Sequence, residues 1–299
     1  MPLVDFKELM EHAEKKKYAI GYFESWNMES LLAAYDAAES LRSPIILGFS
    51  GIFMTHDKRV VKDPLSMYAA LVNEACRQIS VPACSLFNES PKLEPVLDAI
   101  DMDYRMVMFT DEKLSFEQQI EKVKLVVGKA HKKNVAVEGE LVSLQGIEHE
   151  LTEVPDDLKF TTPEAALSFV EQTEVDSLAV NIGQAHMHGK KEFHIRLDIL
   201  KKIKDKVNIP LVLHGGSYIN ADDMKKAIEI GIRKVNVGSI LKKVYFQSIK
   251  EAAQKLSFES NPYEVVGSGF EKDINVKARI ELQKVIEMFI MQYGSNNKA

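Results

Sequence analysis

Eight short apolar runs, each separated from the next by a polar loop and a helix-like stretch, constrain the fold of this chain most. The runs are YAIGYF (18–23), PIILGF (44–49), VPACSLF (81–87), RMVMFT (105–110), VAVEGEL (135–141), SLAVNI (177–182), PLVLHG (210–215) and KVNVGS (234–239). Continuous apolar runs are typical of strands buried on both faces, as in parallel sheets. Eight such strands alternating with helices predict an α/β fold, the (β/α)8 TIM barrel.

Helix-end signals lie between these runs at the positions that a barrel requires. They are Asn27 as an N-cap, Ser115 with Gln118 in a capping-box spacing, Thr162 before Pro163, and Asn220 with a terminal Gly231. An open doubly wound sheet is the rival fold. Such sheets often carry a GxGxxG loop after the first strand, and this chain has none there. The pattern therefore favours the barrel.

The chain is expected to form a single barrel domain over residues 1–299, with residues 261–299 as a C-terminal helical extension. The extension contains the stretch INVKARIELQKVIEMFIMQYG. Its predicted apolar face comprises Ile280, Val285, Ile286, Phe289 and Ile290. We expect this face to pack on the barrel or on a second subunit.

Charge and cysteine content exclude several classes of partner. The net charge is −6 and the pI about 5.8, so no basic field exists to bind nucleic acid. The two cysteines, Cys76 and Cys84, cannot build a disulfide framework, which suits a reducing compartment. No signal-peptide pattern and no run of 18 apolar residues occurs, so we expect a cytoplasmic protein without membrane contact.

Histidines cluster where the sixth and seventh runs end. His186 and His188 follow the sixth run, and His214 ends the seventh. TIM barrels carry their chemistry at the C-terminal ends of the strands. Two histidines from adjacent strand ends, with a carboxylate nearby, form a ligand set that suits Zn²⁺ or another divalent transition metal. We therefore predict His186 and His214 as metal ligands and interpret His188 as an ordinary loop residue.

Two glycine-rich strand ends suggest a phosphate site. HGGS (214–217) and NVGS (236–239) end the seventh and eighth runs, where TIM barrels frequently bind phosphate through backbone N–H groups. Ser217 and Ser239 add hydroxyl donors. The alternative is that both motifs are tight turns that need glycine only for their conformation.

A long acidic insertion, EGELVSLQGIEHELTEVPDDLKF (138–160), includes the end of the fifth run. Loops of this length in compact folds often act as lids over an active site. Glu148 lies two residues after Gly146, and closure of the loop would bring it to the site. Glu150, Glu153, Asp156 and Asp157 of the loop are interpreted as solvated acidic residues.

Several stretches resemble the class II, zinc-dependent fructose-bisphosphate and tagatose-bisphosphate aldolases. They include SPIILGFS, VEGELVSLQG, VDSLAVNIGQAHM and IPLVLHGGS, and the resemblance covers nearly the whole chain. It implies that His186 and His214 are two of three zinc-binding histidines, that Ser50 contacts substrate and that Glu148 handles a proton. It also implies phosphate and substrate loops, whose residues are Gly183, Gly215, Gly216, Ser217, Asn236, Gly238 and Ser239.

The chain departs from this family at three motifs. The family's HLDHG is LFNES here, so its catalytic aspartate becomes Asn88 and its first zinc histidine becomes Glu89. The family's NVDT is NVGS, which places Gly238 at an aspartate position, and its FNVNN is FESWN, which introduces Glu24 as a further candidate substrate-binding residue. Asn88 cannot accept the C4 hydroxyl proton. Two roles are open for Glu89, third metal ligand or displaced base, and Glu24 would supply the other.

The resemblance implies a metal-dependent, aldolase-like lyase that acts on a phosphorylated ketose through an enediolate, with altered acceptor-end specificity. Its candidate catalytic residues are Ser50, Asn88, Glu89 and Glu148. Two alternatives are a non-catalytic sugar-phosphate-binding protein and an isomerase or epimerase that uses the same enediolate. The partner is a phosphorylated sugar, and the family's usual assembly implies a homodimer or homotetramer.

Overall fold

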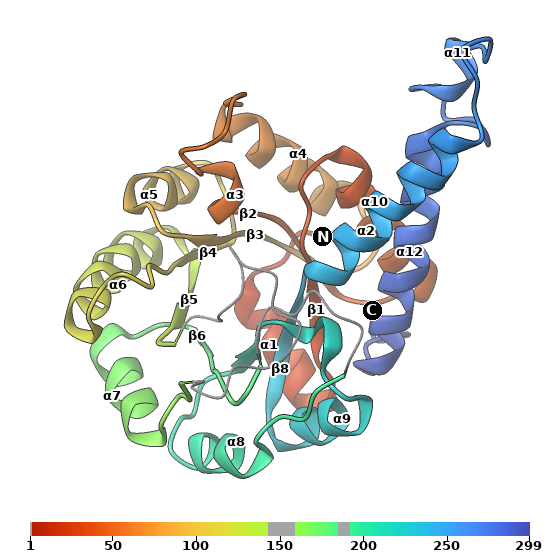
Figure 1. Ribbon diagram of the computed structural model, residues 1–299. Coiled ribbons are helices and arrows are strands. Elements are labelled where there is room, and N and C mark those ends of the chain that lie inside the picture. Colours follow the sequence, from red (N-terminus) through yellow and green to blue (C-terminus); the bar gives the residue numbers. More distant parts are fainter. Residues whose placement is uncertain (1, 143–158, 185–191) are drawn as a thin grey trace.

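The computed structural model describes residues 2–142, 159–184 and 192–299 and contains a closed barrel of eight parallel strands in chain order (Figure 1). The strands are β1 Ile20–Phe23, β2 Ile45–Ser50, β3 Ala83–Ser90, β4 Met106–Phe109, β5 Ala136–Glu140, β6 Ser177–Ala179, β7 Leu211–Leu213 and β8 Ile232–Val237. Each strand lies within or overlaps one of the eight apolar runs. The predicted TIM barrel is therefore confirmed.

The outer helices cover the barrel in the order that the sequence predicts (Figure 1). They are α2 Met28–Leu41, α4 Leu65–Gln78, α5 Leu93–Asp101, α6 Phe116–Ala130, α7 Pro163–Thr173, α8 Leu197–Lys204, α9 Ala221–Ile230 and α10 Ser239–Gln254. Short helices follow β2, β7 and α6, namely α3 Gly51–Met54, η2 Gly216–Tyr218 and η1 His131–Lys133. The predicted N-caps are all present, with full capping boxes at α2 and α6.

The C-terminal segment contains α11 Pro262–Val265 and α12 Ile274–Gln292. Helix α12 packs against α2 and α10, and α10 and α12 extend together beyond the barrel to α11 (Figure 1). Ile286, Phe289 and Ile290 are buried as predicted, whereas Ile280 is exposed. Ile280 lies two residues, or about 200° around the helix, from the buried Leu282, so it belongs to the opposite face.

An apolar cluster closes the N-terminal end of the barrel interior. Helix α1 (Phe6–Lys16) lies across this end and packs on inward-facing residues from the first halves of β1 to β4. We call this cluster the barrel floor; it comprises Phe6, Leu9, Met10, Ala13, Tyr18, Ile20, Tyr22, Ile46, Cys84, Leu86 and Met106. Because side chains alternate along a strand, positions two and four residues further on face the same interior. These positions carry polar residues at the other end, the barrel mouth.

None of the helices within the described ranges is long and apolar enough to cross a lipid bilayer.

Candidate active site

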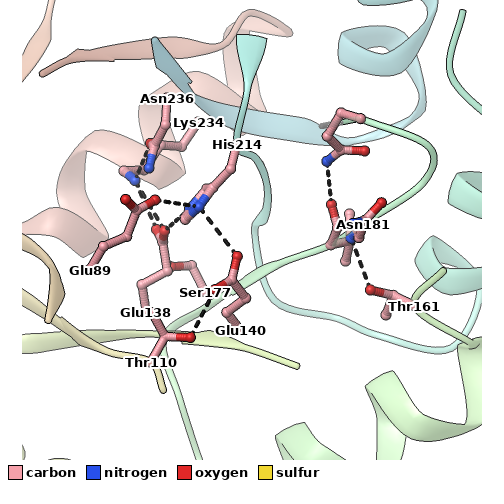
Figure 2. Close-up of polar contacts among 12 residues, drawn as sticks. Glu89, Thr110, Glu138, Glu140, Thr161, Ser177, Asn181, His214, Lys234 and Asn236 are labelled. Atoms are coloured by element: carbon pink, nitrogen blue, oxygen red, sulfur yellow. Dashed lines mark hydrogen bonds and ion pairs between the residues drawn. The ribbon is translucent and has the colours of Figure 1, made fainter. Parts of the chain in front are cut away.

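His214 lies at the centre of a buried ionic cluster at the barrel mouth (Figure 2). It directly follows β7, and its side chain is 3% exposed. Its Nδ1 atom lies 2.7 Å from Glu89 Oε1 and 3.4 Å from Glu140 Oε1. Its Nε2 atom lies 2.8 Å from Glu138 Oε1. Three carboxylates from β3 and β5 therefore surround one imidazole ring.

The carboxylates favour the charged form of the His214 imidazole ring, and a metal bound at Nδ1 would displace the proton there. Burial alone would lower the pKa of His214, but the charges and hydrogen bonds of Glu89 and Glu138, helped by the charge of Glu140, raise it to about 10. Burial lowers the pKa of a histidine but raises that of a carboxyl group, so burial alone would raise the pKa of Glu138. The positive charges of Lys234 and His214 outweigh that effect and hold the pKa of Glu138 below its ordinary value.

Lys234 is the second cation of this cluster and is fully buried. Its Nζ atom lies 3.0 Å from Glu138 Oε2, donates to Asn236 Oδ1 at 2.6 Å, and sits 5.3 Å from the centre of the Tyr22 ring. The sequence analysis missed Lys234. The sequence feature that could have identified Lys234 is a charged residue inside an apolar run. It lies two positions before Asn236 and therefore on the same face of β8.

Glu138 and Glu140 come from alternate positions of β5 and both face the interior. Thr110, which follows β4, donates from Oγ1 to Glu140 Oε2 at 2.9 Å and fixes that carboxylate (Figure 2). Both glutamates lie within the fifth apolar run, VAVEGEL, and the sequence indicated no role for them. Their contact with His214 makes them members of the site.

Asn88 and Glu89 belong to β3 itself, whereas the sequence predicted a strand that ends at residue 87. The register with β4 shifts between Phe87 and Ser90, and Glu89 has a left-handed φ of +49°. Regular alternation would turn Glu89 away from Asn88 and out of the interior. A bulge re-aims side chains in this way, and here the carboxylate of Glu89 reaches His214.

Three predicted site residues present buried polar atoms with no hydrogen-bond partner among the described residues. They are Ser50 Oγ at the end of β2, Asn88 Oδ1 on β3 and Asn236 Nδ2 on β8. An unsatisfied buried polar atom typically costs about 1–3 kcal/mol. Buried exceptions of this kind point to a polar ligand or ordered water.

The HGGS turn after β7 needs its glycines for conformation and space. Gly215 has a φ of +65°, and a Cβ atom at Gly216 would overlap Val235 Cγ1 of β8. The Oγ atom of Ser217 lies 3.4 Å from the backbone nitrogen of Ile240, in the first turn of α10. The turn thus lies against the N-terminus of α10, while phosphate binding there stays a prediction.

Glu24 follows β1 and forms a separate ion pair at the mouth. Its Oε1 atom lies 2.7 Å from the Nζ atom of Lys242, which belongs to α10. Its Oε2 atom occupies the space that a Cβ atom on Gly238 would need. Burial raises the pKa of Glu24; the charge of Lys242 opposes this rise and that of Glu89 adds to it.

Only some of the remaining predicted site residues lie within the described part of the structure. His186 and Glu148 lie outside the described residues, so their places in the site stay predictions. Gly183, after β6, has a φ of +114°, and its N–H donates to Asn181 Oδ1 at 3.1 Å. The glycine at this position therefore fits a conformation that other residues rarely adopt. Ser239 is the first residue of α10, whose N-cap, Gly238, provides no side-chain cap.

The donor set around His214 among the described residues has the chemistry that a divalent metal prefers but not yet the spacing of a formed metal site. Within the described part of the chain, no group of three or more His, Cys, Asp or Glu side chains already has the spacing of a metal site. Tetrahedral zinc keeps neighbouring ligand atoms about 3.3 Å apart. His214 Nδ1 and Glu140 Oε1 already have this separation, whereas Glu89 would have to move away by about 0.6 Å. Glu138 holds the other ring nitrogen, as carboxylates do for metal-binding histidines.

Comparisons with known proteins identify the family of this chain. The family model for class II fructose-bisphosphate aldolase matches residues 4–298. The sulfofructosephosphate aldolase of Alkalicoccus urumqiensis is 32% identical over 300 residues, which cover 100% of this chain and 99% of that protein.

Solved structures resemble the whole chain as well. The YdjI aldolase of Escherichia coli K12 is 28% identical with a TM-score of 0.79 and covers 99% of both chains. The fructose-bisphosphate aldolase of Campylobacter jejuni, at 19% identity and a TM-score of 0.76, covers 99% of this chain and 97% of its own and supports the fold alone. With a family model that spans almost every residue, this protein belongs to the class II fructose-bisphosphate aldolase family and is an aldolase-type lyase.

Proposed function

We propose that this lyase cleaves a phosphorylated ketose by a retro-aldol reaction through an enediolate, with a divalent metal at His214. The observation that carries the proposal is the combination of His214, held among carboxylates, with polar atoms of Ser50, Asn88 and Asn236 that have no hydrogen-bond partner among the described residues. A polyhydroxylated ligand satisfies such atoms, and an ionic cluster beside it stabilises developing charge.

The metal would be held by His214, Glu89 and Glu140, with His186 as a further predicted ligand. A bound divalent metal supplies Lewis-acid chemistry to a carbonyl and stabilises an enediolate. Glu138 orients His214 by accepting from Nε2, and Lys234 keeps Glu138 ionised. We assign Glu89 to the metal and not to proton transfer, because its carboxylate faces the same nitrogen atom of His214 as Glu140 does.

The substrate phosphate would bind where the β7 turn meets α10. Gly215 and Gly216 allow close approach of a ligand to the backbone, and Ser217 lies against the first turn of α10. A helix N-terminus favours an anion through its N–H groups and its dipole.

Asn88 binds a substrate hydroxyl in this scheme but cannot take its proton, so with Glu89 on the metal that proton would pass to the carboxylate of Glu24. Because the amide replaces a carboxylate, we expect the acceptor end of the substrate to differ from that of fructose 1,6-bisphosphate. The relative from Alkalicoccus urumqiensis carries the name of an enzyme for sulfofructose phosphate. The first substrate panel should therefore contain sulfofructose phosphate, tagatose 1,6-bisphosphate and fructose 1,6-bisphosphate.

Metal analysis tests the assignment of Glu89. We expect about one zinc, cobalt or manganese ion per chain in the untagged wild type and in Glu112→Ala, which alters an exposed glutamate. Glu89→Ala should retain less than about a tenth of this metal, because a loss of one of three or four ligands weakens the site strongly. Full metal occupancy in Glu89→Ala would exclude Glu89 as a ligand and make it the candidate base.

Proton exchange tests the reaction class independently. The metal-loaded wild type should exchange a C3 proton of dihydroxyacetone phosphate with solvent, since enediolate formation needs no aldehyde partner. An enzyme that binds metal and this phosphate but exchanges no proton would refute the aldolase proposal. The alternative, a non-catalytic sugar-phosphate-binding protein, would then be the favoured function.

We further propose that the protein forms a homo-oligomer through α10, α11 and α12. This arm exposes large apolar side chains, and such patches commonly mark interfaces. They are Phe246, Phe258, Tyr263, Val266, Phe270, Met288 and Met291. Light scattering after size-exclusion chromatography should give at least twice the chain mass of 33.7 kDa. A monomer at micromolar concentration would contradict this proposal.

A further inference from the structure

Gly238 and Glu24 fit together as a pair. A Cβ atom built on Gly238 would overlap Glu24 Oε2 and lie 3.4 Å from Glu24 Cδ. The backbone does not itself require glycine here, because the φ of Gly238 is −136° and lies outside the left-handed region. The missing side chain after β8 therefore makes room for a carboxylate that follows β1.

Lys242 holds this carboxylate in place. Its Nζ atom lies 2.7 Å from Glu24 Oε1 and 3.4 Å from the centre of the Phe53 ring. The ring of Trp26 flanks the same ammonium group at 5.8 Å. On the backbone side, the N–H of Glu24 donates to Val237 O at 2.9 Å. Glu24 is thus fixed at both its backbone and its carboxylate.

Glu24 and Gly238 lie on the same side of the barrel mouth as Ser50 and Asn236, whose buried polar atoms have no hydrogen-bond partner among the described residues. Strand β1 lies between β8, which carries Asn236, and β2, which ends at Ser50. The Glu24 side chain is 15% exposed, and its carboxylate experiences the charge of Glu89. A ligand in contact with Ser50 and Asn236 therefore passes next to Glu24.

We propose that Glu24 is a specificity-determining residue that accepts a hydrogen bond from a hydroxyl of the substrate's sugar chain, with Gly238 and Lys242 as its positioning residues. The inference rests on the proposed function for the class of ligand, a phosphorylated polyhydroxyl compound. It adds that the carboxylate that contacts the hydroxyl follows β1 and enters through the gap at Gly238. The substitution Glu24→Gln would keep the shape of the side chain and remove its negative charge, and with it the strong acceptor.

Ligand binding tests the role of Glu24 without turnover. A hexitol 1,6-bisphosphate lacks the carbonyl and cannot be cleaved, so its Kd for the metal-loaded protein reports binding alone. Glu24→Gln should raise this Kd by about 10-fold or more, as expected for a lost hydrogen bond to a charged group. The Kd for dihydroxyacetone phosphate, which lacks the outer hydroxyls, should change by less than about threefold.

A double-mutant cycle tests the role of Gly238. Gly238→Ala should displace the flexible carboxylate and weaken hexitol bisphosphate binding about as much as Glu24→Gln does. In a Glu24→Ala background the same substitution should have almost no effect, because nothing remains to be displaced. Gly128→Ala is the matched control, since a Cβ atom there meets nothing within 4 Å. It should leave both Kd values unchanged.

Several outcomes would overturn the inference. They are equal weakening by Gly238→Ala in both backgrounds, equal weakening of both ligands by Glu24→Gln, and a wild type that does not bind the hexitol bisphosphate. The proposed function fails differently, namely when the wild type binds dihydroxyacetone phosphate but does not exchange its proton. The binding cycle remains informative in that case, so the two failures are distinguishable.

Discussion

The floor and the mouth of the barrel interior are built by the same strands but differ in what they bury. At the floor, Tyr22, Cys84 and Leu86 pack under α1 in an apolar cluster. Two residues further along β1 and β3, Glu24 and Asn88 face the same interior and carry polar groups. The comparison shows that apolar packing and the candidate site are separated along one strand by a single step of the β alternation.

Lys234 and Glu138 form the layer between these two regions. Both side chains are fully buried, and their charges are compensated by each other, by His214 and by Asn236. A buried ion pair is strongly destabilising to break but contributes little net stability when intact. We interpret this layer as a support that orients the mouth, which rests on the apolar packing below it.

The largest effect on stability should come from breaking this layer. Lys234→Met leaves the carboxylate of Glu138 without its lysine and should lower the free energy of unfolding by about 3–5 kcal/mol. Urea denaturation would measure it. Metal affinity should fall too, because Glu138 then orients His214 less firmly. Adding Glu138→Gln should recover part of the stability but not the metal affinity; full recovery of both would contradict the supporting role.

A cavity in the floor should lower stability without altering the mouth. Leu86 is fully buried, and Leu86→Ala should reduce the free energy of unfolding by about 3 kcal/mol through lost burial and an unfilled cavity. Calorimetric titration with Zn²⁺ should give the wild-type Kd within about twofold. A large loss of metal affinity would show that the two regions are not separable.

The smallest effect should come from Ser177, whose Oγ atom lies 3.4 Å from Glu138 Oε2. Ser177→Ala removes a long hydrogen bond while Lys234 and His214 still hold that carboxylate. The expected loss is about 1 kcal/mol, measured by the same urea denaturation as for Lys234→Met. A loss as large as that of Lys234→Met would mean that the hydroxyl, and not the ammonium, controls Glu138.

The sequence predicted the architecture well because its signals are local. Apolar runs buried on both faces indicated the eight strands, and caps such as Asn27 and Ser115 marked helix starts that the structure confirms. The same patterns placed His214 at the end of a strand and the glutamates of β5 within one. Lys234 was not predicted as a site residue, because a lysine at the start of a short apolar run is usually interpreted as an exposed residue at a strand end and not as a buried counter-charge.

By itself, then, the sequence determined the barrel, and it predicted which end of the barrel carries the candidate site and that His214 belongs to it. Only the tertiary structure decided how two carboxylates reach that site. Glu89 turns inward because of a register shift against β4, and Glu24 enters the gap at Gly238 after β8. The physical reason is that both depend on the approach of separate strands to one another, whereas residue periodicity records only which face each position would occupy in a regular strand.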